Sequence, residues 1–263
     1  HTKYNFFLDQ KLFIANTVLS ITGKLKKDKN LIKSESQRYI ISFNGQIYNY
    51  KELEKKYLNK NTRNVSDTEI LANLFDKIKI NNVSKKLNGM FAYVLFDTKN
   101  LELVISNDVQ GEKNLYLFED EEHLIISSTL KPIIEIKKNL KLNKISLINY
   151  FSTRHFMPIR ETAFENIKLL DSGIVCRYSL KNFKKRISLF ENPLDWINHK
   201  KHDYYNKMSE KKFLDFFEKA LLKQAKLMIP NVNYGSIVSG GIDSSLQTAI
   251  LSKFKNPNFL LSI

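Results

Sequence analysis

Residues 234–263 constrain the fold more than any other part of the chain. Apolar runs at 234–238 and 258–263 predict two strands, and the amphipathic run 243–254 between them predicts a helix. A strand, a helix and a strand in this order predict a right-handed crossover and the opening of a parallel sheet. Because two parallel strands leave both faces of a sheet uncovered, we expect most of this domain to lie beyond Ile263.

The turn between the first of these strands and the helix is rich in glycine and hydroxyl groups. It reads Ser239, Gly240, Gly241, Ile242, Asp243, Ser244 and Ser245. Glycines let backbone N–H groups approach a ligand closely, and a helix N-terminus carries partial positive charge, so the turn suits an anion. No Gly-Lys-Ser/Thr follows, which excludes a Walker loop. Asp243 would repel bare phosphate, and a bridging Mg²⁺ removes that conflict. The simpler alternative is a turn in which Asp243 or Ser244 only caps the helix.

The remaining sequence predicts a mixed domain followed by a linker. Alternating apolar runs predict strands, and apolar residues at helical spacing predict helices. Asn44 and Gly45 suit a tight turn after the strand at 39–43. We expect strands at 11–21, 39–43, 90–96, 101–106, 114–118, 123–127, 173–180 and 186–190. The four strands from 90–96 to 123–127 should form one antiparallel meander. We expect helices at 51–58, 67–78 and 144–151.

A change of pattern predicts a domain boundary. Residues 191–208 show no sustained periodicity and read as a linker. An amphipathic helix should begin at Ser209 and end before Pro230. Its expected buried stripe comprises Phe213, Phe216, Phe217, Ala220, Leu221 and Met228. The predicted domains are therefore 1–190 and 209–263, with 191–208 between them.

Composition narrows the class of protein. The 263 residues include 42 Lys and Arg against 27 Asp and Glu, a net charge of +15. The lysines are scattered without interleaved aromatic platforms, so no nucleic-acid partner is expected; a nucleic-acid-binding module would show affinity that falls steeply with salt. The single cysteine fits a reducing compartment, and no apolar run approaches the roughly 20 residues of a bilayer span. We expect a cytoplasmic protein, and the missing initiator Met suggests a fragment.

Several motifs in order resemble one enzyme family. The turn at 239–245 is similar to the PP-loop of ATP-pyrophosphatases. Upstream, the chain has FNGQIYNY at 43–50, SDTE at 66–69, LNGMFA at 87–92, and the residues Asp108, Gly111, Lys113, Leu115 and Tyr116. These resemble class II glutamine amidotransferases, and the two halves together resemble glutamine-dependent asparagine synthetase. The resemblance implies an α+β amino-terminal domain, a four-layer αββα sandwich like that of Ntn hydrolases, followed by the start of an α/β parallel-sheet PP-loop domain.

The resemblance assigns a glutamine site to the amino-terminal half. Asn44 and Gly45 match the oxyanion hole, and Asp67 matches the carboxylate that holds the ammonium of glutamine. Ser66 and Glu69 also form a capping box, which is an equal alternative role for this segment. The implied glutamine-binding residues are Val18, Leu19, Ser20, Ile21, Asn44, Gly45, Gln46 and Asp67.

Four positions and the nucleophile depart from the family pattern. The family uses an amino-terminal Cys, whereas residue 1 is His and the lone Cys176 lies in mid-chain, where a buried apolar role is expected. We expect the nucleophile upstream; Thr2 after loss of His1 is an alternative. Val18 and Gln46 replace an Arg and a Glu of the substrate clamp, and Asn107 and Thr129 replace an Arg and a Glu. These changes predict a degenerate glutaminase site, or an unusual donor.

The resemblance also implies the reaction. Aspartate would be adenylated by MgATP, and ammonia from glutamine or from solution would displace AMP to give asparagine. ATP and pyrophosphate would contact Val238, Ser239, Gly240, Gly241, Asp243, Ser244, Ser245 and Ile263, with Asp243 as the Mg²⁺ ligand. The fragment alone should be inactive, and a homodimer is possible for the whole protein. Amidation of another acid or a sugar, and a non-catalytic scaffold-like remnant, are the alternatives.

Overall fold

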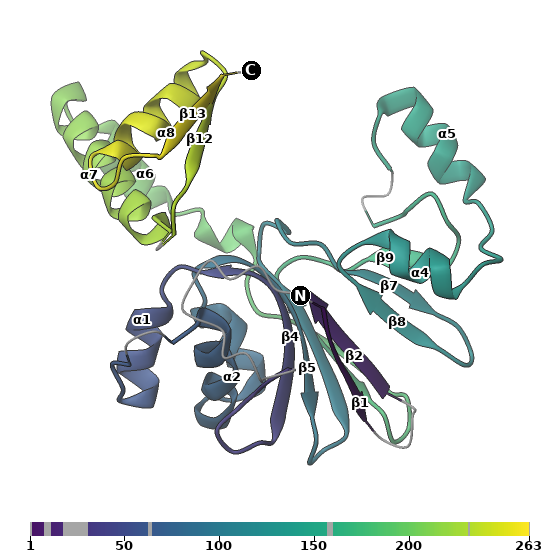
Figure 1. The fold of residues 1–263 in the computed structure, drawn as a ribbon. Helices are drawn as coiled ribbons and strands as arrows, with labels where there is room; N and C mark the ends of the chain where they lie inside the picture. Colours follow the sequence, from purple (N-terminus) through teal and green to yellow (C-terminus); the bar gives the residue numbers. More distant parts are fainter. Residues whose placement is uncertain are drawn as a thin grey trace.

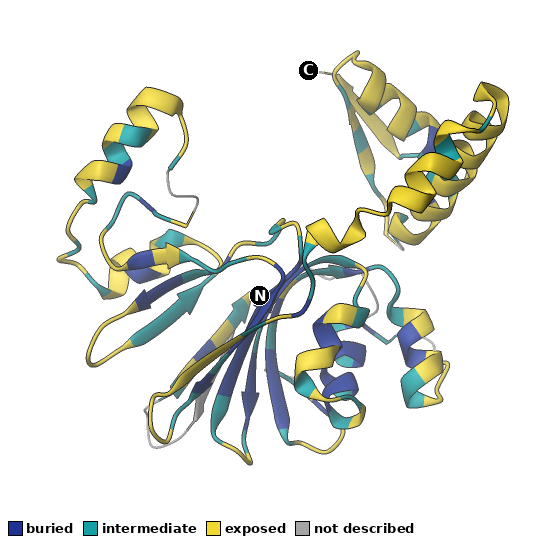
Figure 2. Ribbon diagram, turned by 180° about the vertical axis from the view of Figure 1, so that it is seen from behind, coloured by how far each residue is buried: buried dark blue, intermediate teal, exposed yellow. Residues whose placement is uncertain are grey.

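A computed structural model describes residues 2–7, 12–17, 31–62, 65–156, 160–230 and 232–262. Its centre is a six-stranded antiparallel sheet in the order β11-β10-β6-β5-β4-β3 (Figure 1). The strands are β3 (Ile32–Lys33), β4 (Tyr39–Ile47), β5 (Gly89–Asp97), β6 (Glu102–Asn107), β10 (Ile174–Ser179) and β11 (Lys185–Leu189). Alternate residues of β4, β5, β6 and β10 enter different cores, so both faces of the sheet are buried over these strands (Figure 2), whereas the edge strand β11 is largely exposed.

Short helices cover one face of the central sheet. They are α1 (Tyr50–Leu53), the π-helix η1 (Glu54–Leu58), α2 (Asp67–Lys77), α3 (Ile80–Val83) and the 3₁₀ turn η2 (Ser84–Lys86). The predicted helices at 51–58 and 67–78 are confirmed. Helix α2 buries Ile70, Leu71, Leu74 and Phe75 against the sheet, as their spacing predicted.

Shorter strands cover the opposite face. They form the sheet β8-β7-β9, made of β7 (Tyr116–Glu119), β8 (Leu124–Ser127) and β9 (Ile167–Leu169), and the pair β1 (Thr2–Phe7) and β2 (Leu12–Thr17). Ile14, Leu115 and Leu117 pack between the sheets. Helix α4 (Leu130–Ile136) then packs on the outer side through Ile133. The layers are therefore helix, sheet, sheet and helix.

The predicted four-stranded meander is wrong in one respect. The pairs β5–β6 and β7–β8 are antiparallel as expected, but they belong to different sheets. Asp108 is the reason, because its buried carboxylate fixes the chain in a loop directly after β6. The chain thus leaves the central sheet before β7 begins. Helix α5 (Lys144–Thr153) was correctly expected at 144–151 and extends away from the layers (Figure 1).

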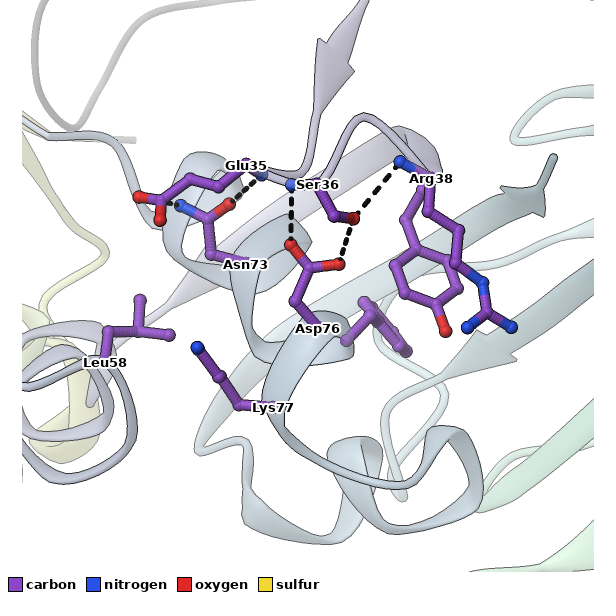
Figure 3. Close-up of a pocket in the computed structure, with 9 residues that line it drawn as sticks. Glu35, Ser36, Arg38, Leu58, Asn73, Asp76 and Lys77 are labelled. Carbon is purple, nitrogen blue, oxygen red and sulfur yellow. Dashed lines mark hydrogen bonds between the residues drawn. The ribbon is translucent and has the colours of Figure 1, made fainter. Parts of the chain in front are cut away.

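The turn before β4 is fixed to helix α2. Asp76 accepts hydrogen bonds from the backbone N–H of Ser36, at 3.0 Å, and from its hydroxyl, while the Asn73 amide oxygen accepts the N–H of Glu35 at 2.8 Å (Figure 3). These groups line a hollow of about 390 Å³ that also includes Arg38. Because its acceptors already bind the turn, we assign this hollow a structural role.

The carboxyl-terminal part has helices where a linker was expected. Residues 191–208 contain η3 (Pro193–Trp196) and α6 (His199–Asn206), so this segment holds two short helices, and its role as a linker between domains stays a prediction. The side-chain oxygens of Asn192 and Asn198 accept backbone N–H groups of these turns. Asparagine caps can start short helices without any apolar periodicity, which is why the pattern missed them.

The last elements form a strand–helix–strand unit beside a long helix. Helix α7 (Glu210–Met228) follows Ser209 as predicted, and β12 (Gly235–Val238) and β13 (Phe259–Ser262) are parallel strands joined by α8 (Ile242–Ser252). The predicted buried stripe of α7 is wrong for this structure. Helix α7 is exposed over most of its length (Figure 2). Phe213, Phe216 and Phe217 are exposed, and among the described residues of α7 only Ala225 is buried. Helix α8 packs on α7, and the Tyr205 ring of α6 lies 5.1 Å from the Phe216 ring, but these contacts leave the three Phe side chains exposed.

Candidate functional sites

Asn44 and Gly45 lie inside strand β4, so the predicted tight turn is wrong. Strand β4 continues to Ile47 and pairs with β5 over its whole length. Gly45 has φ +143°, and a Cβ on it would lie 2.1 Å from the Met90 carbonyl oxygen. The glycine is therefore required for close approach of two strands. Its positive φ was expected, but its cause is long-range pairing.

Strand register places several predicted residues at one end of the central sheet. Asn44 is opposite Ala92, and Ala92 is opposite Asn107 on the next strand. Opposed residues point to the same face, and Ala92 belongs to the core between the two sheets. Gln46, opposite Met90, shares that face two residues further along. Asn44 is exposed, whereas Ala92 and Asn107 are buried.

Asp67 reaches the same end of the sheet from helix α2. Its Oδ2 accepts the N–H of Ile47 at 3.0 Å, and its Oδ1 accepts the N–H of Thr68 at 2.9 Å. The Ser66–Glu69 capping box is confirmed. Asp67 is thus fixed beside the end of β4, close to the residues with which the resemblance groups it, and its role toward an ammonium stays a prediction.

A second loop at this end is organised by Asp108. Its carboxylate accepts the backbone N–H groups of Phe91, Glu112 and Lys113 at 2.9 to 3.1 Å. A hollow of about 420 Å³ lies next to it, and its lining includes Tyr48, Asp108, Glu112, Trp196, Gln224 and Met228. Burial, and then the negative charges of Glu112 and Asp108, raise the pKa of Tyr48. The loop thus faces helix α7 across a hollow whose lining is mainly apolar.

Some residues assigned by the resemblance cannot be placed. Val18, Leu19, Ser20, Ile21 and Ile263 lie outside the described residues. Cys176 is fully buried between the sheets, and burial raises the pKa of its thiol to about 11. Its predicted role as a buried apolar residue is confirmed, because a protonated, inaccessible thiol is not a nucleophile.

The serine- and glycine-rich turn connects β12 to α8. Gly240 has φ +77°, and a Cβ placed on it would find no atom within 4 Å. The Ser244 hydroxyl accepts the N–H of Ser239 at 3.2 Å and lies 3.1 Å from the Ser239 hydroxyl. The alternative role of Asp243 or Ser244 as the helix cap is not borne out. Gly241 is the N-cap, and no side chain in the described residues caps this helix.

The geometry of this turn suits an anion. The first N–H groups of α8 lack a side-chain acceptor, and open space lies beside Gly240. Ser239, Asp243 and Ser245 are exposed around it. Among the described residues no group of three or more His, Cys, Asp or Glu side chains could hold a metal ion by itself. One carboxylate is nevertheless enough for Mg²⁺ when substrate phosphates supply further ligands.

Asn107 was noted in the sequence only as a departure from the family, and it is the one residue at the sheet end that sequence reasoning missed as a site candidate. Its side chain is 1% exposed, and its Oδ1 has no hydrogen-bond partner within the described ranges. The pairing of β5 with β6 places Asn107 on the same face as Ala92, and strand periodicity within β6 alone does not show this. Nor does the sequence show the missing partner.

None of the described helices has both the length and the apolar character needed to cross a membrane.

Comparisons with known proteins show the family of the chain. A family model for the glutamine amidotransferase domain matches residues 2–188, and the chain belongs to this family. It is 32% identical over 220 residues to the protein named asparagine synthetase 2 (glutamine-hydrolyzing) in Methanocaldococcus jannaschii, covering 82% of this chain and 40% of that protein. It is 27% identical to asparagine synthetase 1 (glutamine-hydrolyzing) of Lotus japonicus, over 92% of this chain and 35% of that protein.

The chain is therefore asparagine synthetase-like and spans less than half the length of these relatives. Among solved structures, it is similar to a glutamine phosphoribosylpyrophosphate amidotransferase from B. subtilis, with a TM-score of 0.41 and 14% identity, covering 88% of this chain and 47% of that chain.

Proposed function

We propose that this protein carries out ATP-dependent amidation of a carboxylate, with aspartate as the acid and asparagine as the product. Glutamine or free ammonia supplies the nitrogen, and ATP and Mg²⁺ are required. The names of the curated relatives support this choice of reaction. Residues 1–190 would form the donor domain, of Ntn-hydrolase type, and residues 209–263 would begin the PP-loop domain. The single cysteine favours the cytoplasm as the setting.

The observation that carries the proposal is the turn between β12 and α8. It follows a glutamine amidotransferase domain in the same chain, and it combines a parallel strand pair with an uncapped helix N-terminus. Backbone N–H groups fixed in this way stabilise the negative charge of a pyrophosphate leaving group without reorganisation. The open space at Gly240 leaves room for phosphate oxygens close to the backbone.

Each residue of the turn has a separate task in this proposal. The N–H groups following Gly240 and Gly241 and the hydroxyls of Ser239, Ser244 and Ser245 hold the β- and γ-phosphates. The Ser239–Ser244 contact orients both hydroxyls before nucleotide arrives. Asp243, in the first turn of α8, would hold Mg²⁺, which neutralises charge on the departing pyrophosphate. Backbone groups of Val238 and Ile263 would contact adenine.

The two half-reactions then follow in order. The carboxylate of the acid attacks the α-phosphorus, the bond to the pyrophosphate oxygen breaks, and an acyl-adenylate forms. Ammonia adds to the acyl carbon, loses a proton and displaces AMP. The protein's contribution is alignment and charge neutralisation.

On the donor side, the positions of Asn44, Gly45 and Asp67 at one end of β4 support a glutamine site. Asn44 and Gly45 would stabilise the oxyanion, and Asp67 would hold the α-ammonium. Gln46 lies on the same face but carries no charge, and Val18 cannot form an ion pair. A protein with a degenerate donor site, which takes nitrogen from free ammonia or another donor and acts on another acid or a sugar, is therefore the second candidate. A non-catalytic remnant is the third.

Calorimetric titration of pyrophosphate into the chain tests the turn. We expect binding that requires Mg²⁺ and that Asp243→Asn weakens about tenfold. Asp195→Asn, a change to an exposed carboxylate in η3, serves as the matched control and should have no effect. Absence of binding at millimolar pyrophosphate, or equal binding by the Asp243 variant, would contradict the assignment.

A further inference from the structure

Two neighbouring polar residues on β6 are both buried but differ in their hydrogen bonding. Ser106 donates to the Ile174 carbonyl at 2.7 Å and contacts the Ser84 hydroxyl at 3.0 Å. Asn107 is equally buried, yet its Oδ1 finds no partner in the part of the chain that the structure describes. A buried acceptor without a donor is unfavourable, so such a group calls for an explanation.

The position of Asn107 suggests what its partner is. Asn44, Ala92 and Asn107 stand opposite one another on three adjacent strands and face the space between the two sheets. The row runs from a buried residue, Asn107, to an exposed one, Asn44. It is therefore open to solvent at the end where the oxyanion residue lies.

The spacing of this row fits a small polar group. Adjacent strands lie about 4.8 Å apart, so the Asn44 and Asn107 backbones are separated by roughly 9.6 Å. A planar amide with a hydrogen bond of about 2.9 Å on either side spans that separation. Between the two asparagines stands Ala92, which has the smallest side chain of the row.

We propose that Asn107 is a substrate-binding residue of the donor site and that it accepts an N–H of a primary carboxamide whose oxygen faces Asn44. This inference rests on the proposed donor function. It assigns to Asn107 the recognition of the carboxamide, which is the reacting end of the donor. Val18 and Gln46 stand instead at the positions that the resemblance assigns to binding the amino acid end. The substrate class is then a primary carboxamide, of which glutamine is the probe.

A ligand-binding role and a structural role predict opposite effects of substitution. Leu has nearly the shape of Asn and carries no polar atom. If the hydrogen-bond partner of the Asn107 oxygen is a ligand, Asn107→Leu removes a group that is unpaired in the free protein. The melting temperature of the free protein should then rise by roughly 2 to 4 °C. If Asn107 supports the fold, the same change should lower it.

Glutamine titration, followed by NMR, and thermal unfolding of the same samples test the proposal. We expect Asn107→Leu to weaken glutamine binding at least tenfold while the protein becomes more stable. Ser106→Ala is the control, because its side chain is satisfied within the fold. It should lower stability and leave glutamine affinity within about twofold.

The outcomes separate this inference from the function on which it rests. If the unaltered chain binds glutamine and Asn107→Leu binds it equally well, the role of Asn107 is refuted and the donor site stands. A lower melting temperature for Asn107→Leu refutes it too, because a structural role then explains the residue. If the unaltered chain binds no glutamine, the glutamine donor function and this inference both fail.

Discussion

Replacing Gly45 with alanine should destabilise the protein strongly, because two independent costs fall on one residue. At φ +143° an L side chain is strained, which costs on the order of 1–3 kcal/mol. The added Cβ would also lie 2.1 Å from the Met90 oxygen and 2.7 Å from the Phe91 Cα. Both are backbone atoms that cannot rotate away, so β4 and β5 must separate locally. We expect a total loss of at least about 3 kcal/mol and a melting temperature lower by roughly 6 to 12 °C.

Circular dichroism during thermal unfolding measures this effect, and Gly240→Ala provides the comparison. Gly240 also has a positive φ, but its Cβ would meet no atom within 4 Å. Only the backbone strain applies there, so the loss should be about 1–2 kcal/mol. If Gly45→Ala is no less stable than Gly240→Ala, the close approach of β4 and β5 at Gly45 is refuted.

Three further predictions follow from the described contacts. Glu69→Ala removes half of the capping box with Ser66 and should cost about 1 kcal/mol in urea unfolding; an unchanged midpoint would contradict the cap. Burial of Asp97 acts to raise its pKa, but hydrogen bonds from Arg38 and backbone N–H groups outweigh it and lower the pKa. That stabilisation is present above the unfolded pKa of about 3.9 and is lost as pH falls through the lower folded value. Asp97→Asn should therefore flatten the acid side of a plot of unfolding free energy against pH. A curve that runs parallel to that of the unaltered protein would refute the pairing of Asp97 with Arg38. Cys176, with a pKa of about 11, should resist a thiol reagent at pH 8 until urea unfolds the chain, and fast labelling of the native protein would show that it is accessible.

Local signals in the sequence were sufficient for many elements. The Ser66–Glu69 box and the apolar spacing of α2 fixed that helix, because caps and amphipathic stripes act within one or two turns. The strand–helix–strand unit at 235–262 was also predicted correctly, since a crossover between parallel strands has few alternatives.

Long-range effects account for the errors. Nothing adjacent to Asn44 and Gly45 indicates that β5 pairs through them, so the dipeptide resembled a turn. The division of the expected meander depends on buried hydrogen bonds of Asp108 to residues on two segments. The exposure of Phe213 and Phe217 depends on which elements pack against α7. The helical spacing of apolar residues does not show which elements these are.

The candidate site residues also differ in whether local or long-range features reveal them. Residue types at the Ser239 turn indicated an anion because glycine, serine and a helix start act locally. The unpaired oxygen of Asn107 and its position opposite Ala92 and Asn44 could be recognised only from the register of three strands and from its hydrogen bonds.

The most direct measurement of the central claim is the exchange of labelled pyrophosphate into ATP by the natural gene product. With Mg²⁺ and aspartate present, and neither glutamine nor ammonia added, we expect labelled ATP to accumulate, because acyl-adenylate formation at the Ser239 turn is reversible. Asp243→Asn should abolish most of that exchange. If no carboxylic acid supports exchange, or if label enters ATP equally without an acid, the chain does not belong to an enzyme that activates a carboxylate by adenylation.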